Sequence, residues 1–280
     1  TAPDRPAGRG KKLQSSAVKK YAIANGLQVL QPTNLKDPDF IKTIKIINAE
    51  LFVVVAFRML PEVVWSIPKK GTINLHASLL PNYRGAAPIN WAIINGEKQT
   101  GVTTFFIEKE IDTGKIIHQK KVEIFEQDTA GTIHDKLMSE GANLLIQTID
   151  SLSIGKNPSI DQQSMIDHEL KGAPKINKQT GRIQWDKPKE VVNNLIRGLS
   201  PYPGAWTNIE IDNKQFLFKI YKASCVKGSS KPGFITINNN QLLIGCSDGY
   251  LKLAEIQLEG KKRMLAKEFV KGARITNFQC

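Results

Sequence analysis

An unbroken apolar run at residues 51–57 constrains the fold more than any other feature of the sequence. The run is rich in β-branched and aromatic side chains and does not alternate with polar residues, so it predicts a strand that is buried on both faces. Such strands form parallel sheets that helices cover on both sides. The run is far too short to cross a bilayer, and the basic, polar start of the chain does not resemble a signal peptide.

Helical and strand-like segments alternate around this run up to residue 155. Apolar periodicity and capping residues predict helices at 18–25, 37–50, 88–95 and 132–152. Short apolar runs predict strands at 27–30, 51–57, 73–77, 102–107 and 116–124. Alternation of this kind indicates a layered α/β domain with a mainly parallel sheet.

The pattern changes beyond residue 155. Residues 156–172 are polar and without periodicity, which predicts a linker. A helix at 188–197 follows, and after it come short strands separated by turns, which are typical of a small antiparallel barrel. We therefore expect one domain at 1–155, the linker at 156–172 and a second domain at 173–280.

The net charge of +13 is unevenly distributed along the chain. Residues 173–280 contribute +10 and residues 1–20 contribute +5, whereas residues 21–172 contribute −2. Two basic ends around a near-neutral middle favour a polyanionic partner, most simply a nucleic acid. The alternative is that the lysines serve only solubility.

The cysteines and the short motifs argue against several kinds of site. Cys225, Cys246 and Cys280 show no CxxC spacing, so they predict reduced thiols in a cytoplasmic protein. The sequence contains no HExxH, GxGxxG or phosphate-loop motif. We therefore expect no metal, and neither a dinucleotide nor a nucleoside-triphosphate site.

Asn74 and His76 lie two residues apart in the predicted strand at 73–77. Residues i and i+2 of a strand point to one face, and open α/β sheets bind ligands at the carboxyl ends of their strands. Asp112 lies in a polar turn between two later strands. An amide, an imidazole and a carboxylate suit acyl transfer between amines, because they can stabilise an oxyanion, move a proton and orient the imidazole. The alternative is that His76 is structural, as most lone strand histidines are.

The segment at residues 3–12 displays four cations within eight residues, and its glycines and prolines disfavour regular structure. Such a segment can lay charge on a phosphate backbone or enter a groove. The alternative is a disordered basic terminus. The candidate cations are Arg5, Arg9, Lys11 and Lys12.

Taken together, these residues resemble the methionyl-tRNA formyltransferase family. The match runs nearly end to end, through PDRPAGRGKK at 3–12, INLHASLLPNYRGAAPINWAI at 73–93, TGVT at 100–103, IDTGKII at 111–117, GRIQW at 181–185 and SPYPGAW at 200–206. The Asn-x-His-x-Ser-Leu-Leu-Pro block with its distal Asp is specific for folate-dependent formyltransferases. The basic loop and the C-terminal domain narrow the resemblance to the enzymes that act on tRNA.

The resemblance implies a Rossmann-like formyltransferase domain followed by an OB-like β-barrel domain. It implies transfer of a formyl group from 10-formyltetrahydrofolate to the amino group of methionyl-initiator tRNA, for translation initiation. By motif match, Asn74, His76 and Asp112 would be catalytic. The residues that would line the folate site are Ser78, Leu79, Leu80 and Pro81.

The resemblance also implies how the tRNA would be held. Arg9 would approach the acceptor-stem end, helped by Lys11 and Lys12. We expect a cytoplasmic monomer without membrane contact, because the basic surface is reserved for RNA.

The sequence departs from the family at its start, since family members have an earlier strand, helix and strand. We therefore expect an N-terminally truncated fragment of a longer gene product. The rival enzyme is a formyltransferase that acts on a purine precursor or a nucleotide sugar and has less need of basic charge. A rival of another class is a non-catalytic tRNA-binding protein, which would bind no folate.

Overall fold

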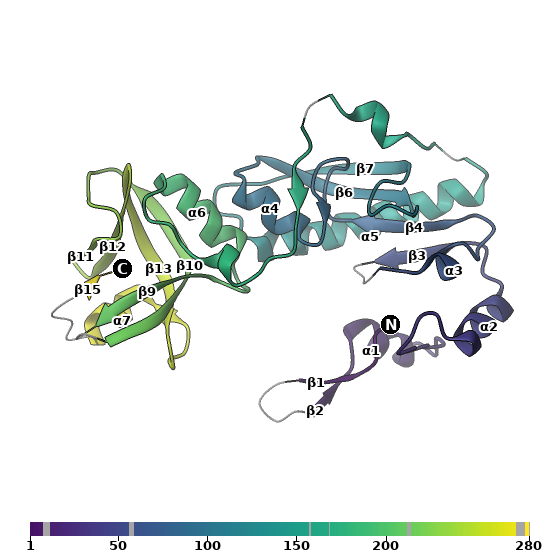
Figure 1. Cartoon of the computed structure of the whole chain (residues 1–280), viewed down its shortest axis with the longest axis horizontal. Coiled ribbons are helices and arrows are strands. Elements are labelled where there is room, and N and C mark those ends of the chain that lie inside the picture. Colours follow the sequence, from purple (N-terminus) through teal and green to yellow (C-terminus); the bar gives the residue numbers. More distant parts are fainter. Residues whose placement is uncertain are drawn as a thin grey trace. The chain divides into compact units, whose positions relative to one another are not determined.

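The computed structural model describes residues 1–7, 12–55, 59–156, 158–167, 169–211, 214–272 and 278–279 of the 280-residue chain. The chain forms two compact units, Thr1–Asn74 and Leu75–Cys280. Figure 1 labels most of the helices and strands of both units. The predicted domain boundaries at residues 155 and 172 are separate from this division and stay predictions.

The first unit begins with a strand pair and continues with helices. Its elements in chain order are β1 (Arg5–Ala7), β2 (Lys12–Gln14), α1 (Ala17–Ala24), α2 (Pro38–Ile47), β3 (Phe52–Val55) and α3 (Glu62–Trp65). The sequence offers Ser15 or Ser16 as the cap of α1, and Ser16 is the one that accepts a hydrogen bond from Lys19 N. The cap predicted for α2 is confirmed, because Asp37 accepts a hydrogen bond from Phe40 N. Pro38 occupies the first turn of α2, where its missing N–H costs nothing.

Two local predictions in this unit are wrong. Residues 27–30 form no strand: Leu27 is exposed, and the carbonyl of Leu30 accepts from the amino group of Thr1. β1 and β2 pair antiparallel with Arg5 opposite Gln14, so the described part of the basic segment has regular structure. Pairing with a neighbouring strand overrides the local preference of Pro6, which lies opposite Leu13.

The burial predicted for residues 51–57 is also wrong over the described residues. In β3, Phe52 and Val54 are partly buried, whereas Val53 and Val55 are 40% and 51% exposed. β3 is an end strand in the order β3-β4-β6-β7. Successive side chains of a strand face opposite ways, and only one face of this strand is covered.

The sheet continues through β4 (Thr72–His76), which crosses from the first unit to the second. The next elements are β5 (Arg84–Gly85), α4 (Pro88–Ile94), β6 (Gln99–Phe106), β7 (Ile116–Glu123) and α5 (Ala130–Ser153). β6 and β7 pair antiparallel, and α5 packs along both of them (Figure 1). Their shared core includes Ile93, Val102, Ile133 and Leu137. The predicted helices and the strands at 73–77, 102–107 and 116–124 are thus confirmed, with their ends shifted by a few residues.

The segment predicted as a linker is attached to the sheet at several points. Ile160 forms a bridge with Ile116 of β7, and η1 (Gln162–Met165) follows. β8 (Gly172–Ala173) then pairs in parallel with β5. This segment therefore returns to the loop that follows β4.

The C-terminal part is an antiparallel sheet with helices packed on it. Its elements are η2 (Gln179–Gly181), α6 (Lys189–Gly198), β9 (Ala205–Ile211), β10 (Lys214–Val226), β11 (Ile235–Asn238), β12 (Gln241–Cys246), β13 (Gly249–Leu258), β14 (Met264–Leu265), α7 (Ala266–Gly272) and β15 (Phe278–Gln279). The strand order is β11-β12-β13-β10-β9-β15. Fully buried Phe218, Ile220 and Leu242 lie in its core. The fold predicted for the two parts of the chain is confirmed.

Helix α6 fastens this sheet to the rest of the second unit. The Arg197 side chain is 8% exposed and donates to the carbonyl oxygens of Phe125 and Asp128, at 3.3 and 3.2 Å. Asn90 of α4 donates to the carbonyl of Gly198 at 2.7 Å. Burial lowers the pKa of Arg197, and the nearby Asp128 carboxylate opposes that shift.

The Asp128 carboxylate organises the turn before α5. It accepts hydrogen bonds from Phe125 N, Thr132 Oγ1 and Lys136 Nζ at 2.8, 2.9 and 2.7 Å. Burial by itself would raise the pKa of Asp128, but these hydrogen bonds outweigh burial and lower it. The charged form therefore stabilises the fold.

We expect Asp128→Asn to lower the free energy of unfolding at neutral pH by about 1.5–3 kcal/mol, the range for hydrogen bonds to charged groups. The folded-state pKa of Asp128 lies below its ordinary value of 3.8. The advantage of the wild type is therefore complete above the unfolded-state pKa and disappears as pH falls through the folded-state pKa. Urea unfolding from about pH 7 down to about pH 3 measures this. The control Asp135→Asn removes a carboxylate whose side chain is 77% exposed, and an equal loss in both variants would contradict the assignment.

Candidate active site

His76 ends β4 and is nearly buried, with 7% of its surface exposed. Its Nε2 lies 2.9 Å from the carbonyl oxygen of Tyr83. A carbonyl only accepts hydrogen bonds, so Nε2 carries the proton in this contact. The Phe105 ring meets the imidazole edge-on, with the ring centroids 6.4 Å apart. Nδ1 is therefore the nitrogen that can take up or release a proton.

Asp112 faces that nitrogen from the turn between β6 and β7. Its Oδ2 lies 3.8 Å from Nδ1 of His76 and accepts a hydrogen bond from the amide of Gly85 at 2.9 Å. The Asp112 side chain is 13% exposed. The carboxylate therefore faces the one ring nitrogen of His76 that is not bonded to a backbone carbonyl. The structure thus brings together two of the three residues predicted to be catalytic.

The third, Asn74, lies two residues before His76 in the same strand. Alternation along a strand places the two side chains on one face. The side-chain oxygen of Asn74 is buried and has no hydrogen-bond partner among the described residues. Buried polar atoms are normally paired, and an unpaired one costs about 1–3 kcal/mol, so such an atom marks a candidate functional group.

The loop at residues 78–81 is held by hydrogen bonds to β6 and β7. Thr103 Oγ1 donates to Ser78 O at 2.6 Å and accepts from Leu80 N at 3.2 Å. Gln119 donates to Leu80 O at 2.7 Å. Ser78, Leu80 and Pro81 are buried, and Leu79 is partly exposed. The predicted folate residues therefore form a fixed loop directly after His76.

A polar cluster behind this loop positions Tyr83. The Tyr83 hydroxyl donates to Glu97 Oε1 at 2.6 Å, and Lys171 Nζ binds the same oxygen at 2.6 Å. Burial and the bond to Glu97 raise the pKa of Tyr83, so the hydroxyl keeps its proton. Burial opposes ionisation of Glu97, but the bonds from Lys171 and Tyr83 lower its pKa overall. This cluster fixes the residue whose carbonyl holds His76.

Sequence patterns missed the residues that surround Asp112. Arg84 stood in the recognised block but had no predicted role, and Gln162 stood in the predicted linker. Gln162 is 1% exposed and bonds to the carbonyls of Asp112 and Gly114. A polar residue in an aperiodic segment gives no local signal of such burial.

The predicted tRNA-binding cations are only partly described. Arg9 and Lys11 lie outside the described residues, as does the side chain of Lys12. Arg5 lies in β1 and is exposed. Their role stays a prediction.

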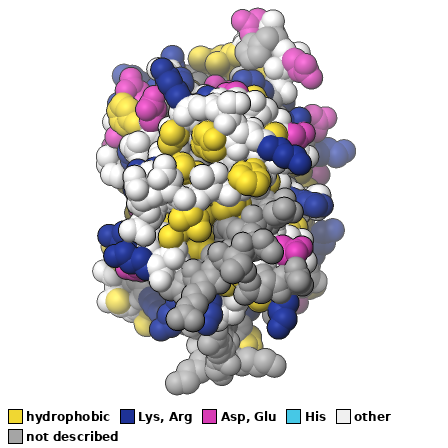
Figure 2. All heavy atoms as spheres, turned by 90° about the vertical axis from the view of Figure 1, so that its left-hand side faces the viewer, with side chains coloured by type: hydrophobic (Ala, Val, Ile, Leu, Met, Phe, Trp, Pro, Cys, Tyr) yellow, Lys and Arg dark blue, Asp and Glu magenta, His cyan; other side chains and the backbone are white. Residues whose placement is uncertain are grey.

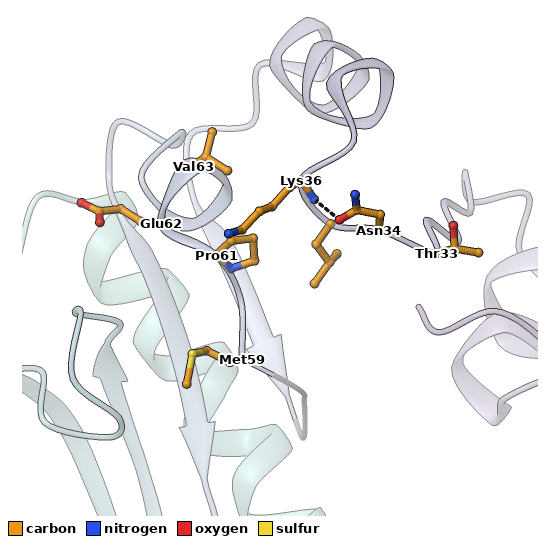
Figure 3. Close-up of a pocket in the computed structure, with 8 residues that line it drawn as sticks. Thr33, Asn34, Lys36, Met59, Pro61, Glu62 and Val63 are labelled. Atoms are coloured by element: carbon orange, nitrogen blue, oxygen red, sulfur yellow. Dashed lines mark hydrogen bonds between the residues drawn. The ribbon is translucent and has the colours of Figure 1, made fainter.

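An open pocket of about 660 Å³ lies in the first unit (Figure 3). Its lining residues are Thr33, Asn34, Leu35, Lys36, Met59, Pro61, Glu62 and Val63. Within it, the amide of Lys36 donates to Asn34 Oδ1 at 3.0 Å. None of the predicted site residues lines this pocket, so pocket size does not locate the site here.

The described part of the chain contains no group of three His, Cys, Asp or Glu side chains arranged to hold a metal ion. It also contains no helix that is long and apolar enough to span a membrane.

Comparisons with known proteins match this sequence to one family. The family model for formyl transferase matches residues 1–149, and that for the formyl transferase C-terminal domain matches residues 175–274. A methionyl-tRNA formyltransferase of Flavobacterium johnsoniae is 49% identical over 274 residues, which cover 97% of this chain and 86% of the relative. Another, of Bacteroides fragilis strain ATCC 25285, is 48% identical over 281 residues, covering 99% of this chain and 87% of the relative.

Solved structures share the fold at lower identity. An N-formyltransferase of Helicobacter canadensis, in complex with folinic acid and dTDP-3-aminofucose, has a TM-score of 0.63 and 22% identity. The match covers 85% of this chain and 82% of that one. At this identity the likeness concerns the fold.

Gly114 provides a test of the turn that carries Asp112. A Cβ added there would clash with the carbonyl oxygen of Phe106. We expect Gly114→Ala to lower the free energy of unfolding by about 1–3 kcal/mol, because the backbone of the turn must shift. Denaturant unfolding measures the loss. Gly172→Ala is the matched control, since a Cβ at Gly172 would meet nothing within 4 Å. Equal stability of the two variants would show that the turn is not tightly constrained.

Proposed function

Since the chain belongs to the formyl transferase family, we propose that it transfers the formyl group of 10-formyltetrahydrofolate to the amino group of methionyl-initiator tRNA. The 49% identity to a methionyl-tRNA formyltransferase along nearly the whole chain supports this most strongly. The buried pair of His76 and Asp112 supplies two of the polar groups that the transfer requires. The product would serve translation initiation.

In the proposed reaction, the lone pair of the neutral methionyl amine attacks the formyl carbon. The formyl oxygen becomes an oxyanion, and the Asn74 amide donates a hydrogen bond to it. A new carbon–nitrogen bond to the amine forms, and the bond between the formyl carbon and folate N10 breaks. The proton that the amine loses ends on N10. A donor aimed at such an oxyanion lowers the barrier by about 3–4 kcal/mol.

His76 is proposed to carry that proton. Because Nε2 is bonded to the Tyr83 carbonyl, Nδ1 accepts the proton from the amine and returns it to the leaving nitrogen. The Asp112 carboxylate stabilises the charged imidazole between these steps. General acid–base catalysis of this kind contributes about 10²–10⁴ in rate.

The folate is proposed to bind along residues 78–81. The loop is held by Thr103 and Gln119, so it presents a fixed edge next to His76. Because the loop is already ordered, it loses little conformational entropy when it positions the formyl carbon for reaction. Partly exposed Leu79 is the side chain of this loop with surface to offer the pterin.

The tRNA is proposed to bind through Arg5, Arg9, Lys11 and Lys12 together with the C-terminal part of the chain. Residues 173–280 carry a charge of +10. Figure 2 shows the face at the left-hand end of Figure 1, where Lys and Arg side chains stand at several places around a central apolar area. Distributed cations suit an extended phosphate backbone better than a single small anion.

Domain organisation, oligomeric state and location belong to the same proposal. The matches at 1–149 and 175–274 support a catalytic domain at 1–155, a linker at 156–172 and a tRNA-binding domain at 173–280. We propose a monomer that acts in the cytoplasm.

Burial raises the pKa of Cys225 to about 12 and that of Cys246 to about 11, so both thiols stay protonated and unreactive.

A formyltransferase that acts on a nucleotide sugar is the second candidate. It is favoured by the fold shared with the Helicobacter canadensis enzyme. Its acceptor carries far fewer phosphates than a tRNA, so its activity would depend only weakly on salt. Binding through several tRNA phosphates loses affinity with a log–log slope of about −0.7 to −0.9 per phosphate.

We expect the chain to move labelled formyl from 10-formyltetrahydrofolate to methionyl-initiator tRNA, with a rate at low tRNA that falls steeply with salt. Transfer to a dTDP-amino sugar instead would select the second candidate. A separate measurement of folate binding tests the remaining alternative, that the chain is a non-catalytic RNA-binding protein. Such a protein would bind tRNA but no folate.

Asn74→Ala is expected to lower the single-turnover rate by about 10²–10³-fold, because the oxyanion loses a preorganised donor. Asn143→Ala, at an exposed position of α5, is the matched control and should leave the rate unchanged. An unchanged rate in Asn74→Ala would remove Asn74 from the mechanism.

A further inference from the structure

The carboxamide of Gln162 is buried and has all four of its hydrogen-bonding positions filled. Nε2 donates to Asp112 O at 2.9 Å and to Gly114 O at 2.7 Å. Oε1 accepts from Arg84 Nε at 3.0 Å and from Arg84 Nη2 at 2.6 Å. A primary amide has two donors and two lone pairs, so none is left for a substrate.

These bonds close a ring through the proposed site. Arg84 is followed by Gly85, whose amide donates to the Asp112 carboxylate at 2.9 Å. Gln162 binds Arg84 on one side and the backbone of Asp112 on the other. Both the backbone and the carboxylate of Asp112 are thereby tied to the loop after β4. That loop also holds His76, through the carbonyl of Tyr83.

The conformation of Asp112 explains why such a tie is needed. Its φ is +56°, in the left-handed region that residues other than glycine rarely adopt. Such a conformation persists only where surrounding contacts over-determine it. Without the bonds from Gln162, the turn could relax and move the carboxylate away from Nδ1 of His76.

We infer that Gln162 is a positioning residue for formyl transfer, which acts by holding the Asp112 turn so that its carboxylate faces His76. This inference rests on the proposed function for its kinetic consequences. It also gives a role to residues 158–167, the described part of the predicted linker that carries Gln162 to the site. Gln162 touches no reacting atom.

The test compares Gln162→Met with Gln163→Met. Both variants replace an amide by an apolar side chain of similar length, but Gln163 is the exposed neighbour. In formyl transfer, Gln162→Met should lower kcat by about 10–100-fold and change KM for either substrate by less than about 3-fold, because a misplaced group acts on the transition state. Gln163→Met should match the wild type. A rise in KM alone, or equal kcat in all three proteins, would overturn the inference.

A double-mutant cycle with Asp112→Asn shows whether Gln162 acts by positioning Asp112 or by stabilising other parts of the site. If Gln162 acts through Asp112, adding Gln162→Met to Asp112→Asn should lower kcat by less than about 3-fold further. Multiplicative losses would show that Gln162 acts by another route.

A readout that needs no activity distinguishes failure of this inference from failure of the proposed function. The Gly85 amide, observed in a ¹⁵N-glycine-labelled protein, donates to the Asp112 carboxylate. Its proton resonance should move upfield in Gln162→Met and stay in place in Gln163→Met. An inactive wild type would reject the proposed function, whereas an unmoved Gly85 resonance would reject the positioning role. If Gln162→Met does not fold, Gln162→Glu keeps the side-chain length, removes the two donors and undergoes the same measurements.

Discussion

The backbone of the turn between β6 and β7 is the constraint on which the site depends. Asp112 is held at φ +56°, and two residues later Gly114 leaves no room for a Cβ against Phe106. His76 has one ring nitrogen engaged by Tyr83, so only Nδ1 remains for chemistry. The carboxylate must therefore face that single nitrogen. A small rotation of the turn would therefore separate Asp112 from His76 without any change in the sequence.

A second constraint lies at α6, which comes later in the sequence of the same unit. Arg197 and Asn90 connect α6 to the turn before α5 and to α4, and these bonds are buried or partly buried. The basic C-terminal sheet is thus fixed to the body that contains His76. Under the proposed function, contacts between tRNA phosphates and this sheet would therefore orient the amine at the site. Binding energy from remote parts of a substrate contributes to rate only through such rigid coupling.

Local patterns predicted those features that local physics determines. The caps at Ser16 and Asp37, the strand that carries Asn74 and His76, and the antiparallel C-terminal sheet all follow from neighbouring residues. The burial of β3 was mispredicted because it depends on what covers the strand and not on its composition. Gln162 was missed for a related reason: its partners, Arg84 and Asp112, lie 78 and 50 residues away. The grouping of His76 with Asp112 came from the chemistry of their side chains and from the resemblance, and not from their spacing.

The same three polar groups would serve any amine acceptor, because the formyl group is transferred to an amino group whether the acceptor is an amino sugar or an aminoacyl group. The site therefore cannot by itself select tRNA. A choice between acceptors requires a difference in binding energy elsewhere. In this chain the feature that would discriminate is charge, with +10 on residues 173–280 and +5 on residues 1–20. Charge at both ends of the sequence, around a near-neutral catalytic region, suits an acceptor much larger than the site itself.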